Sequence, residues 1–224
     1  MTGKHDTTTE RCVLRQSPDL RFLALGDSYT IGESVDESDR WPNQLARQLQ
    51  REFTTLEAPR IIARTGWTTG ELLAGIADAR PPGKYDLVSL LIGVNNQYRG
   101  LDLQEFATEL DELLALSIRM ADATPSHVMV LSIPDWSVTP FAADRDRSAV
   151  ATEIARFNQC LMEHATRHGC THIDITPCSR KADQDTGLLA EDGLHPSASM
   201  YKMWCDLAYP VVREALLQSA RGER

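Results

Sequence analysis

The 224-residue sequence predicts an α/β fold in which a parallel sheet is covered by helices on both faces. Short, continuously apolar runs, which are typical of buried strands, alternate along the chain with longer segments whose apolar residues recur at helical spacing. Strand–helix–strand units of this kind are joined by right-handed crossovers. No linker, internal repeat or low-complexity tract divides the chain, so we expect a polar lead-in over residues 1–19 and a single domain over residues 20–224.

Five short segments are predicted to be strands because each is apolar and too short for a helix. The segment 86–92 is nearly all apolar, as in a central strand that is covered on both faces. The predicted strands cover residues 21–25, 60–63, 86–92, 127–133 and 171–175.

Amphipathic helices are predicted between these strands, since their apolar residues fall on one stripe. They begin near residue 42 and cover residues 68–79, 102–122 and 146–168, with a last helix from about residue 196. The stretches 134–144 and 177–193 are expected to be loops. The last helix is expected to bury Met200, Met203, Trp204, Leu207 and Val211.

The composition limits the partners of the protein. With 42% hydrophobic residues the chain has enough apolar side chains for a sizeable core, and its formal net charge is −9. This charge argues against nucleic acid and anionic membranes, which the average surface would repel. No apolar run is long enough for a bilayer, and the first ten residues lack the apolar segment of a secretory signal, so we expect a cytoplasmic protein. The five cysteines are an odd number at irregular spacing, which argues against a disulfide framework.

Four loops that follow predicted strands carry small or reactive residues. Ser28 follows the first strand, Gly66 the second and Asn95 the third, while Asp192 and His195 end the loop after the fifth. Because the carboxyl ends of parallel strands lie on one edge of a sheet, these loops can converge in one crevice.

These residue types match the requirements of acyl transfer. Ser28 would be the nucleophile, His195 the base that activates it, and Asp192 the carboxylate that orients the imidazole. The backbone N–H groups of Ser28 and Gly66 and the side-chain amide of Asn95 would form the oxyanion hole.

Each residue also has a purely structural interpretation. Ser28 and Asn95 are good helix caps, and His195 also precedes a predicted helix. Gly66 suits a simple turn, and Asp192 could be a solvated charge in a loop. The functional interpretation depends on all four loops meeting at one sheet edge.

The chain resembles the SGNH hydrolases, also called the GDSL esterase/lipase family. The first family block appears as Gly26-Asp27-Ser28, the second as Gly66, the third as Gly93-Val94-Asn95, and the last as Asp192 with His195. All four blocks occur in order and span nearly the whole chain, which makes the resemblance specific.

The resemblance implies a three-layer, flavodoxin-like α/β/α fold with a five-stranded parallel sheet. It also implies hydrolysis of a small-molecule ester through an acyl-enzyme on Ser28, without a metal or other cofactor. Two positions depart from the family pattern: Tyr29 replaces the usual leucine, and Asn96 replaces a common aspartate. The second departure leaves open which bond the usual aspartate would make.

Other residues give weaker signals. Trp67, Tyr98 and Trp136 lie in or beside the loops at the expected edge, where they could line an acyl or sugar pocket or simply pack in the core. Cys160, His164 and His168 recur every four residues, with Cys170 just beyond, but the spacing matches no standard zinc motif, so we expect no metal site. Motifs for nucleotide phosphates are absent from the sequence.

The leading hypothesis is a serine esterase that cleaves an acetyl or other short acyl ester. A thioesterase, a lysophospholipase or an acyltransferase could use the same triad, because the triad activates the nucleophile whatever group accepts the acyl. A flavodoxin-like binding module without catalysis is the alternative from another class.

Overall fold

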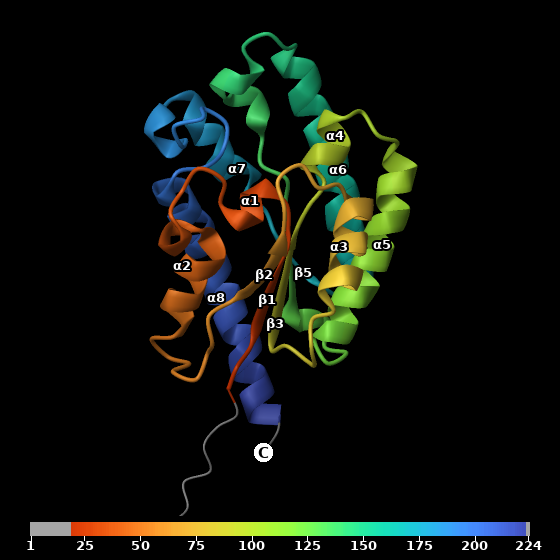
Figure 1. Cartoon of the computed structure of the whole chain (residues 1–224), viewed down its shortest axis with the longest axis vertical. Helices are drawn as coiled ribbons and strands as arrows, with labels where there is room; N and C mark the ends of the chain where they lie inside the picture. Colours follow the sequence, from red (N-terminus) through yellow and green to blue (C-terminus); the bar gives the residue numbers. More distant parts are fainter. Residues whose placement is uncertain (1–18, 223–224) are drawn as a thin grey trace, which may run out of the picture.

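A five-stranded parallel sheet lies at the centre of the computed structural model, which describes residues 19–222 (Figure 1). Its strand order is β2-β1-β3-β4-β5, the flavodoxin-like order, which confirms the predicted fold class. The strands are β1 (Phe22–Gly26), β2 (Arg60–Ala63), β3 (Leu87–Leu91), β4 (Val128–Leu131) and β5 (Thr171–Ile173). Of the predicted lead-in, residues 1–18 lie outside the described residues.

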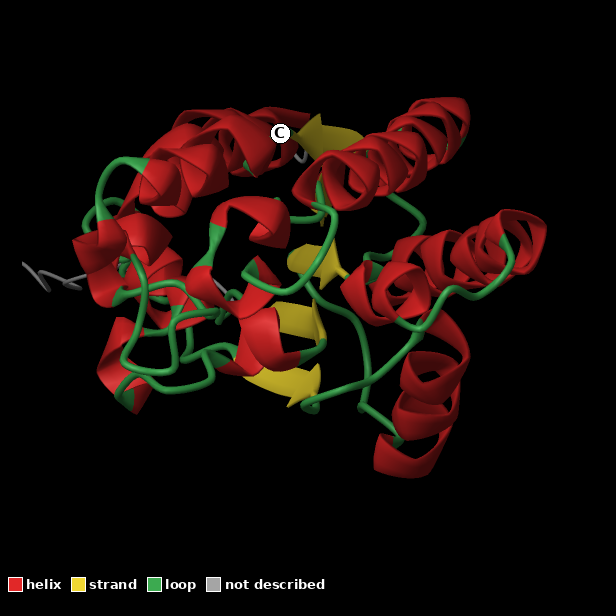
Figure 2. Cartoon of the chain, turned by 90° about the horizontal axis from the view of Figure 1, so that it is seen from above, coloured by secondary structure: helices red, strands yellow, loops and turns green. Residues whose placement is uncertain are grey.

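Helices cover both faces of the sheet. On one side α2 (Trp41–Leu49) packs against α8 (Ala198–Gly222). On the other side, α5 (Leu103–Met120) lies between α3 (Thr69–Ala79) and α6 (Arg147–Arg167). Figure 2, which looks down on the molecule, shows the strands enclosed between the helices. The fold therefore has three layers.

Burial on both faces explains the continuous apolar runs of the central strands. Every residue of β1 and β3 is buried, and Ser89 is the one polar side chain among them. Ile92 and Ile133 are also buried, although they lie beyond the paired residues of their strands. The predicted strands 86–92, 127–133 and 171–175 were therefore slightly too long, because apolar character follows burial rather than the hydrogen-bonded ladder, whereas 60–63 coincides with β2.

Side-chain caps set the starts of the longer helices. Thr68 and Glu71 form a capping box at the start of α3, and Asp102 and Asp146 cap α5 and α6. The predicted helices began at residues 68, 102 and 146, which are the cap residues themselves. Each observed helix therefore begins one residue later than predicted.

The predicted inner face of α8 was partly wrong. Met200 and Trp204 are buried, but Leu207 and Val211 are 43% and 41% exposed. The buried stripe instead continues through small side chains, Cys205 and Ala208, which allow α8 to approach α2 closely. Tyr201, Val212 and Leu216 complete this stripe.

Short helical turns occupy the stretches that were predicted as loops. Residues 134–144 contain the 3₁₀ turns η3 (Trp136–Val138) and η4 (Pro140–Ala142), and the stretch before residue 193 contains α7 (Thr176–Ser179), η5 (Arg180–Asp183) and η6 (Thr186–Leu188). The remaining short elements are α1 (Ser28–Ile31), η1 (Glu37–Asp39), α4 (Val94–Tyr98) and η2 (Pro125–His127). Within residues 19–222, no helix combines the length and apolar character required to cross a membrane.

Candidate active site

The turn after β1 presents Ser28 at the carboxyl edge of the sheet. Asp27 is the N-cap of α1, and its Oδ1 accepts a hydrogen bond of 3.0 Å from the backbone N–H of Tyr29. The capping role considered for Ser28 therefore belongs to Asp27, which leaves the Ser28 hydroxyl available for other contacts. Only glycine fits at position 26, because a Cβ there would come within 2.4 Å of the Leu91 carbonyl oxygen.

Three side chains form a continuous hydrogen-bonded line at this edge. The Nε2 atom of His195 lies 2.9 Å from Ser28 Oγ, and its Nδ1 atom lies 2.7 Å from Asp192 Oδ2. This arrangement fits the imidazole tautomer that carries its proton on Nδ1 and accepts the Ser28 hydroxyl proton at Nε2. The structure thus brings together a hydroxyl, an imidazole and a carboxylate in the arrangement that a nucleophile, its base and an orienting group would require.

The Asp192 carboxylate is held by four hydrogen bonds. Its Oδ1 accepts the backbone N–H groups of Leu194 and His195, both at 2.9 Å. Its Oδ2 accepts the hydroxyl of Ser34 at 2.7 Å as well as the bond from His195. Partial burial raises the pKa of Asp192, but these hydrogen bonds outweigh it and leave that pKa well below its usual range. The carboxylate is therefore charged at neutral pH.

Two further loops supply candidate donors for an oxyanion. Gly66 has φ +85°, in the left-handed region that glycine adopts at little cost, and it lines the same pocket as Ser28. Asn95 also lines this pocket, and its Nδ2 donates a 2.9 Å hydrogen bond to the Trp67 carbonyl oxygen. An amide nitrogen carries two hydrogens, so the second remains available to a developing oxyanion.

The match to a family model decides the classification. The model of the GDSL-like lipase/acylhydrolase family matches residues 24–203. The chain belongs to this family. The sequence resemblance to the SGNH (GDSL) hydrolases is thus confirmed, and the protein is a hydrolase of this class. Comparison with the sequences of curated proteins gives no match.

Solved structures of similar fold include other hydrolases. TesA has a TM-score of 0.69 at 17% identity, over 87% of this chain and 99% of that one. The acetylxylan esterase Axe2 from Geobacillus stearothermophilus has a TM-score of 0.65 at 16% identity, over 86% of this chain and 94% of that one. The psychrotrophic esterase EstA from Pseudoalteromonas sp. has a TM-score of 0.63 at 17% identity, over 88% of this chain and 99% of that one. At these identities the likeness shows a shared fold.

Asn96 departs from the GDSL family pattern but makes two buried hydrogen bonds. Its Oδ1 accepts the backbone N–H of Thr69 at 3.1 Å, and its Nδ2 donates to Thr69 Oγ1 at 2.7 Å. The Thr69 hydroxyl in turn donates to the Glu109 carboxylate on α5. Asn96 therefore ties the loop after β3 to the start of α3.

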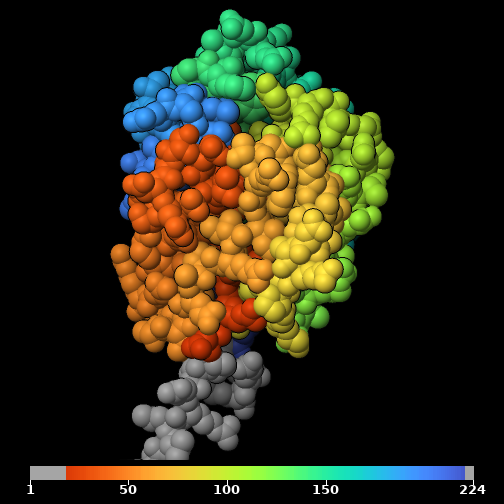
Figure 3. All heavy atoms as spheres, in the orientation of Figure 1, coloured from red at the N-terminus to blue at the C-terminus, as the bar shows by residue number. Residues whose placement is uncertain are grey.

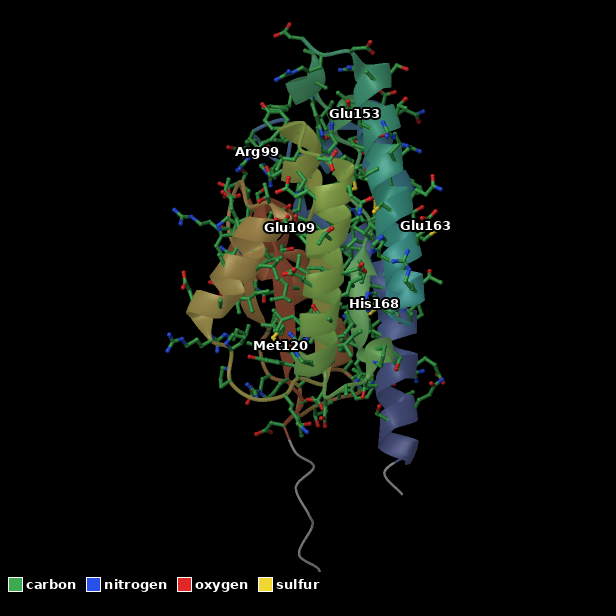
Figure 4. All side chains as sticks on the ribbon, turned by 90° about the vertical axis from the view of Figure 1, so that its right-hand side faces the viewer. Arg99, Glu109, Met120, Glu153, Glu163 and His168 are labelled. Carbon is green, nitrogen blue, oxygen red and sulfur yellow. The ribbon has the colours of Figure 1, made fainter. Side chains whose placement is uncertain are left out.

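Arg99 provides a second tie between the same loops, which the sequence analysis missed. It is the C-cap of α4, and its guanidinium donates to the Gly66 carbonyl oxygen and lies 3.4 Å from Glu71 Oε2. Figure 4 shows Arg99 at the upper end of the face formed by α3, α5 and α6. Arg99 holds the peptide group between Gly66 and Trp67, and Asn95 holds the next one, between Trp67 and Thr68. Together these bonds fix the direction of the Gly66 loop.

Asp27, the residue before Ser28, is a fully buried ionisable group. Burial raises its pKa to about 7, and its Oδ2 has no hydrogen-bond partner among the described residues. Burial also raises the pKa of the neighbouring Tyr29, whose ring centre lies 5.1 Å from that of His195. The Tyr29 ring therefore packs against the imidazole of His195.

A pocket of about 160 Å³ opens beside Ser28 and His195. Tyr98 and Trp136, two of the three predicted binding aromatics, line it together with Phe141. The indole of Trp67 instead packs against α3. Its ring lies so close to Gly75 that a Cβ added there would be only 2.2 Å from it. In Figure 3 the segments around residues 28–40, 95–100, 135–145 and 180–195 gather at the upper end of the molecule, where this pocket lies.

His164 and His168, which were considered above as possible zinc ligands, both contact a carboxylate of α5 instead. His164 Nδ1 and His168 Nε2 lie 2.6 Å and 2.9 Å from the same oxygen of Asp111 on α5. Within residues 19–222, no group of three or more His, Cys, Asp or Glu side chains could hold a metal ion. Cys160, Cys170, Cys178 and Cys205 are free thiols, and Cys12 lies outside the described residues.

Proposed function

We propose that this GDSL hydrolase is a serine esterase that cleaves small carboxylic esters with an acetyl or other short acyl group. The proposal depends on two hydrogen bonds of the His195 imidazole. Its Nε2 lies 2.9 Å from Ser28 Oγ, and its Nδ1 lies 2.7 Å from Asp192 Oδ2. A serine hydroxyl needs a base within this reach to become a nucleophile at neutral pH.

In the first half of the reaction, Ser28 Oγ attacks the ester carbonyl carbon while His195 Nε2 takes the hydroxyl proton. Asp192 stabilises the imidazolium through Nδ1. The negative charge on the former carbonyl oxygen is met by the N–H groups of Ser28 and Gly66 and by the amide of Asn95.

In the second half, the tetrahedral intermediate collapses and the alcohol leaves with the proton from His195, so that the acyl group stays on Ser28. A water molecule then gives its proton to His195 and attacks the acyl carbon, and the acid is released as Ser28 recovers its proton. Axe2 and EstA, which share the fold, are both named as esterases, and this supports the reaction class.

The test compares Ser28→Ala with a matched control, Ser148→Ala, which removes an exposed hydroxyl at the start of α6. With p-nitrophenyl acetate, we expect Ser28→Ala to lose about 10⁴-fold or more in kcat and Ser148→Ala to keep wild-type activity. A fluorophosphonate probe should add one adduct, located at Ser28 by peptide mass spectrometry. Unchanged turnover in a folded Ser28→Ala protein, or a label on another residue, would overturn the proposal.

A further inference from the structure

Three aromatic rings form one wall of the pocket beside the triad. The ring centres of Tyr98, Trp136 and Phe141 lie 5.6, 5.8 and 5.9 Å from one another, so each ring touches the other two. Tyr98 follows Asn95 by three residues on α4, and the other two rings come from η3 and η4. The wall therefore adjoins the candidate oxyanion donor directly.

One ring of this wall is fixed, and the other two lie at the mouth of the pocket. Trp136 is 4% exposed, and its Nε1 donates to Gln97 Oε1 at 2.8 Å. Gln97 Nε2 donates in turn to Glu153 on α6, also at 2.8 Å, and Figure 4 shows Glu153 near the upper end of that helix. In contrast, Tyr98 and Phe141 are 44% and 46% exposed. Large aromatic rings that gather with this exposure beside a nucleophile indicate a binding surface.

The pocket contains no charged side chain that could pair with a charged ligand group. Its ionisable lining residues are Tyr29, Tyr98 and His195, and His195 is engaged by Ser28 and Asp192. Two arginines lie nearby without lining the pocket: the guanidinium of Arg145 is 5.7 Å from the Tyr98 ring centre, and that of Arg99 is engaged by the Gly66 carbonyl oxygen and Glu71. A charged group that entered would lose its hydration without gaining a counter-ion.

The pocket size sets an upper limit on the group that it accepts. Its volume is about 160 Å³, and the reacting carbonyl occupies part of it beside Ser28 and Asn95. An apolar protein cavity of about 150 Å³ holds one benzene molecule. The remaining space therefore fits a group of about six carbons or fewer.

We propose that Tyr98, Trp136 and Phe141 form a specificity subsite, a proposal that rests on the esterase activity proposed above. It accepts one uncharged, apolar group of the ester, of about six carbons or fewer, and it excludes longer chains and carboxylates. The group is either the acyl part or the alcohol part of the substrate, and two substrate series distinguish these.

The first series varies the acyl chain of p-nitrophenyl esters from acetate to octanoate, and the second varies the alcohol of acetate esters from methyl to octyl. We expect one series to lose about 10-fold or more in kcat/KM beyond roughly six carbons. If the acyl series shows the limit, the p-nitrophenyl hemisuccinate should react about 100-fold more slowly than the butyrate. If the alcohol series shows it, an acetate ester with a carboxylate-bearing alcohol should react slower than its uncharged counterpart by the same factor.

Phe141→Ala and Tyr98→Ala should shift the length limit of the same series to longer chains and raise the relative rate of its octyl or octanoyl member about 10-fold. Leu207→Ala is the control, because Leu207 is 43% exposed on α8 and does not line the pocket. A flat profile in both series, or an unchanged limit in both aromatic variants, would refute the subsite.

Binding of uncleaved ligands separates this proposal from the esterase proposal. Titration calorimetry with wild-type protein should show binding of benzamide and at least about 10-fold weaker binding of benzoate and octanamide. If no ester is hydrolysed but benzamide is still preferred, the subsite stands and the esterase proposal falls. Equal binding of all three ligands would refute the subsite, whatever the protein hydrolyses.

Discussion

Replacing Asn95 by alanine tests the proposed oxyanion hole, because the observed structural role of its amide group can be separated from the proposed catalytic one. One hydrogen of Nδ2 is used in the 2.9 Å bond to the Trp67 carbonyl oxygen. Losing an ordinary hydrogen bond of this kind costs about 1 kcal/mol of folding stability. Losing an oxyanion donor costs roughly 100- to 1000-fold in kcat, or about 3–4 kcal/mol of transition-state stabilisation. The effect on kcat should therefore exceed the effect on stability.

The assay measures kcat with p-nitrophenyl acetate and stability by urea unfolding on the same samples. Gln50→Ala is the matched control, because Gln50 Nε2 also donates a 2.9 Å bond to a backbone carbonyl, that of Leu56, away from the pocket. We expect the two variants to lose similar stability and only Asn95→Ala to lose activity. An Asn95→Ala protein with a kcat close to that of Gln50→Ala would refute the assignment.

Two further predictions follow from groups around the triad. Burial raises the pKa of Asp27 to about 7, so its contribution to stability is complete below about pH 4 and is lost as the pH rises through 7. At alkaline pH the loss is roughly 4 kcal/mol, so wild-type Tm should fall between pH 5.5 and 8.5 while Asp27→Asn shows a flatter profile; parallel profiles would contradict the role of Asp27. Arg99 holds the Gly66 carbonyl, so Arg99→Met should lower kcat by about 10-fold with little change in KM, and Arg99→Lys should restore part of it. A KM effect without a kcat effect would instead place Arg99 in substrate binding.

The sequence was sufficient to predict the sheet and the meeting of the candidate site residues at one edge, because both have local signals. Buried parallel strands are continuously apolar, and the residues that follow them are brought to one edge by the topology. Ser28, Asn95 and His195 could therefore be placed near one another before their distances were known.

Contacts between distant loops had no such signal. Ser34 donates to Asp192 across 158 positions, and Arg99 reaches Gly66 across 33. Serine and arginine are common in exposed loops, so nothing in their spacing predicts these partners. The side on which Trp67 packs is equally non-local, because it depends on the space left by Gly75 on the next helix.

The distance in sequence between nucleophile and base has a consequence for biosynthesis. Ser28 and His195 are 167 positions apart, and the base is followed by α8, which packs on α2. If Ser28 and His195 act as proposed, a ribosome-bound chain that has emerged only as far as β5 carries the serine but lacks His195, its proposed base. The proposed activity would then require synthesis to continue past residue 195, and a premature stop before residue 192 would remove two of the three proposed triad residues.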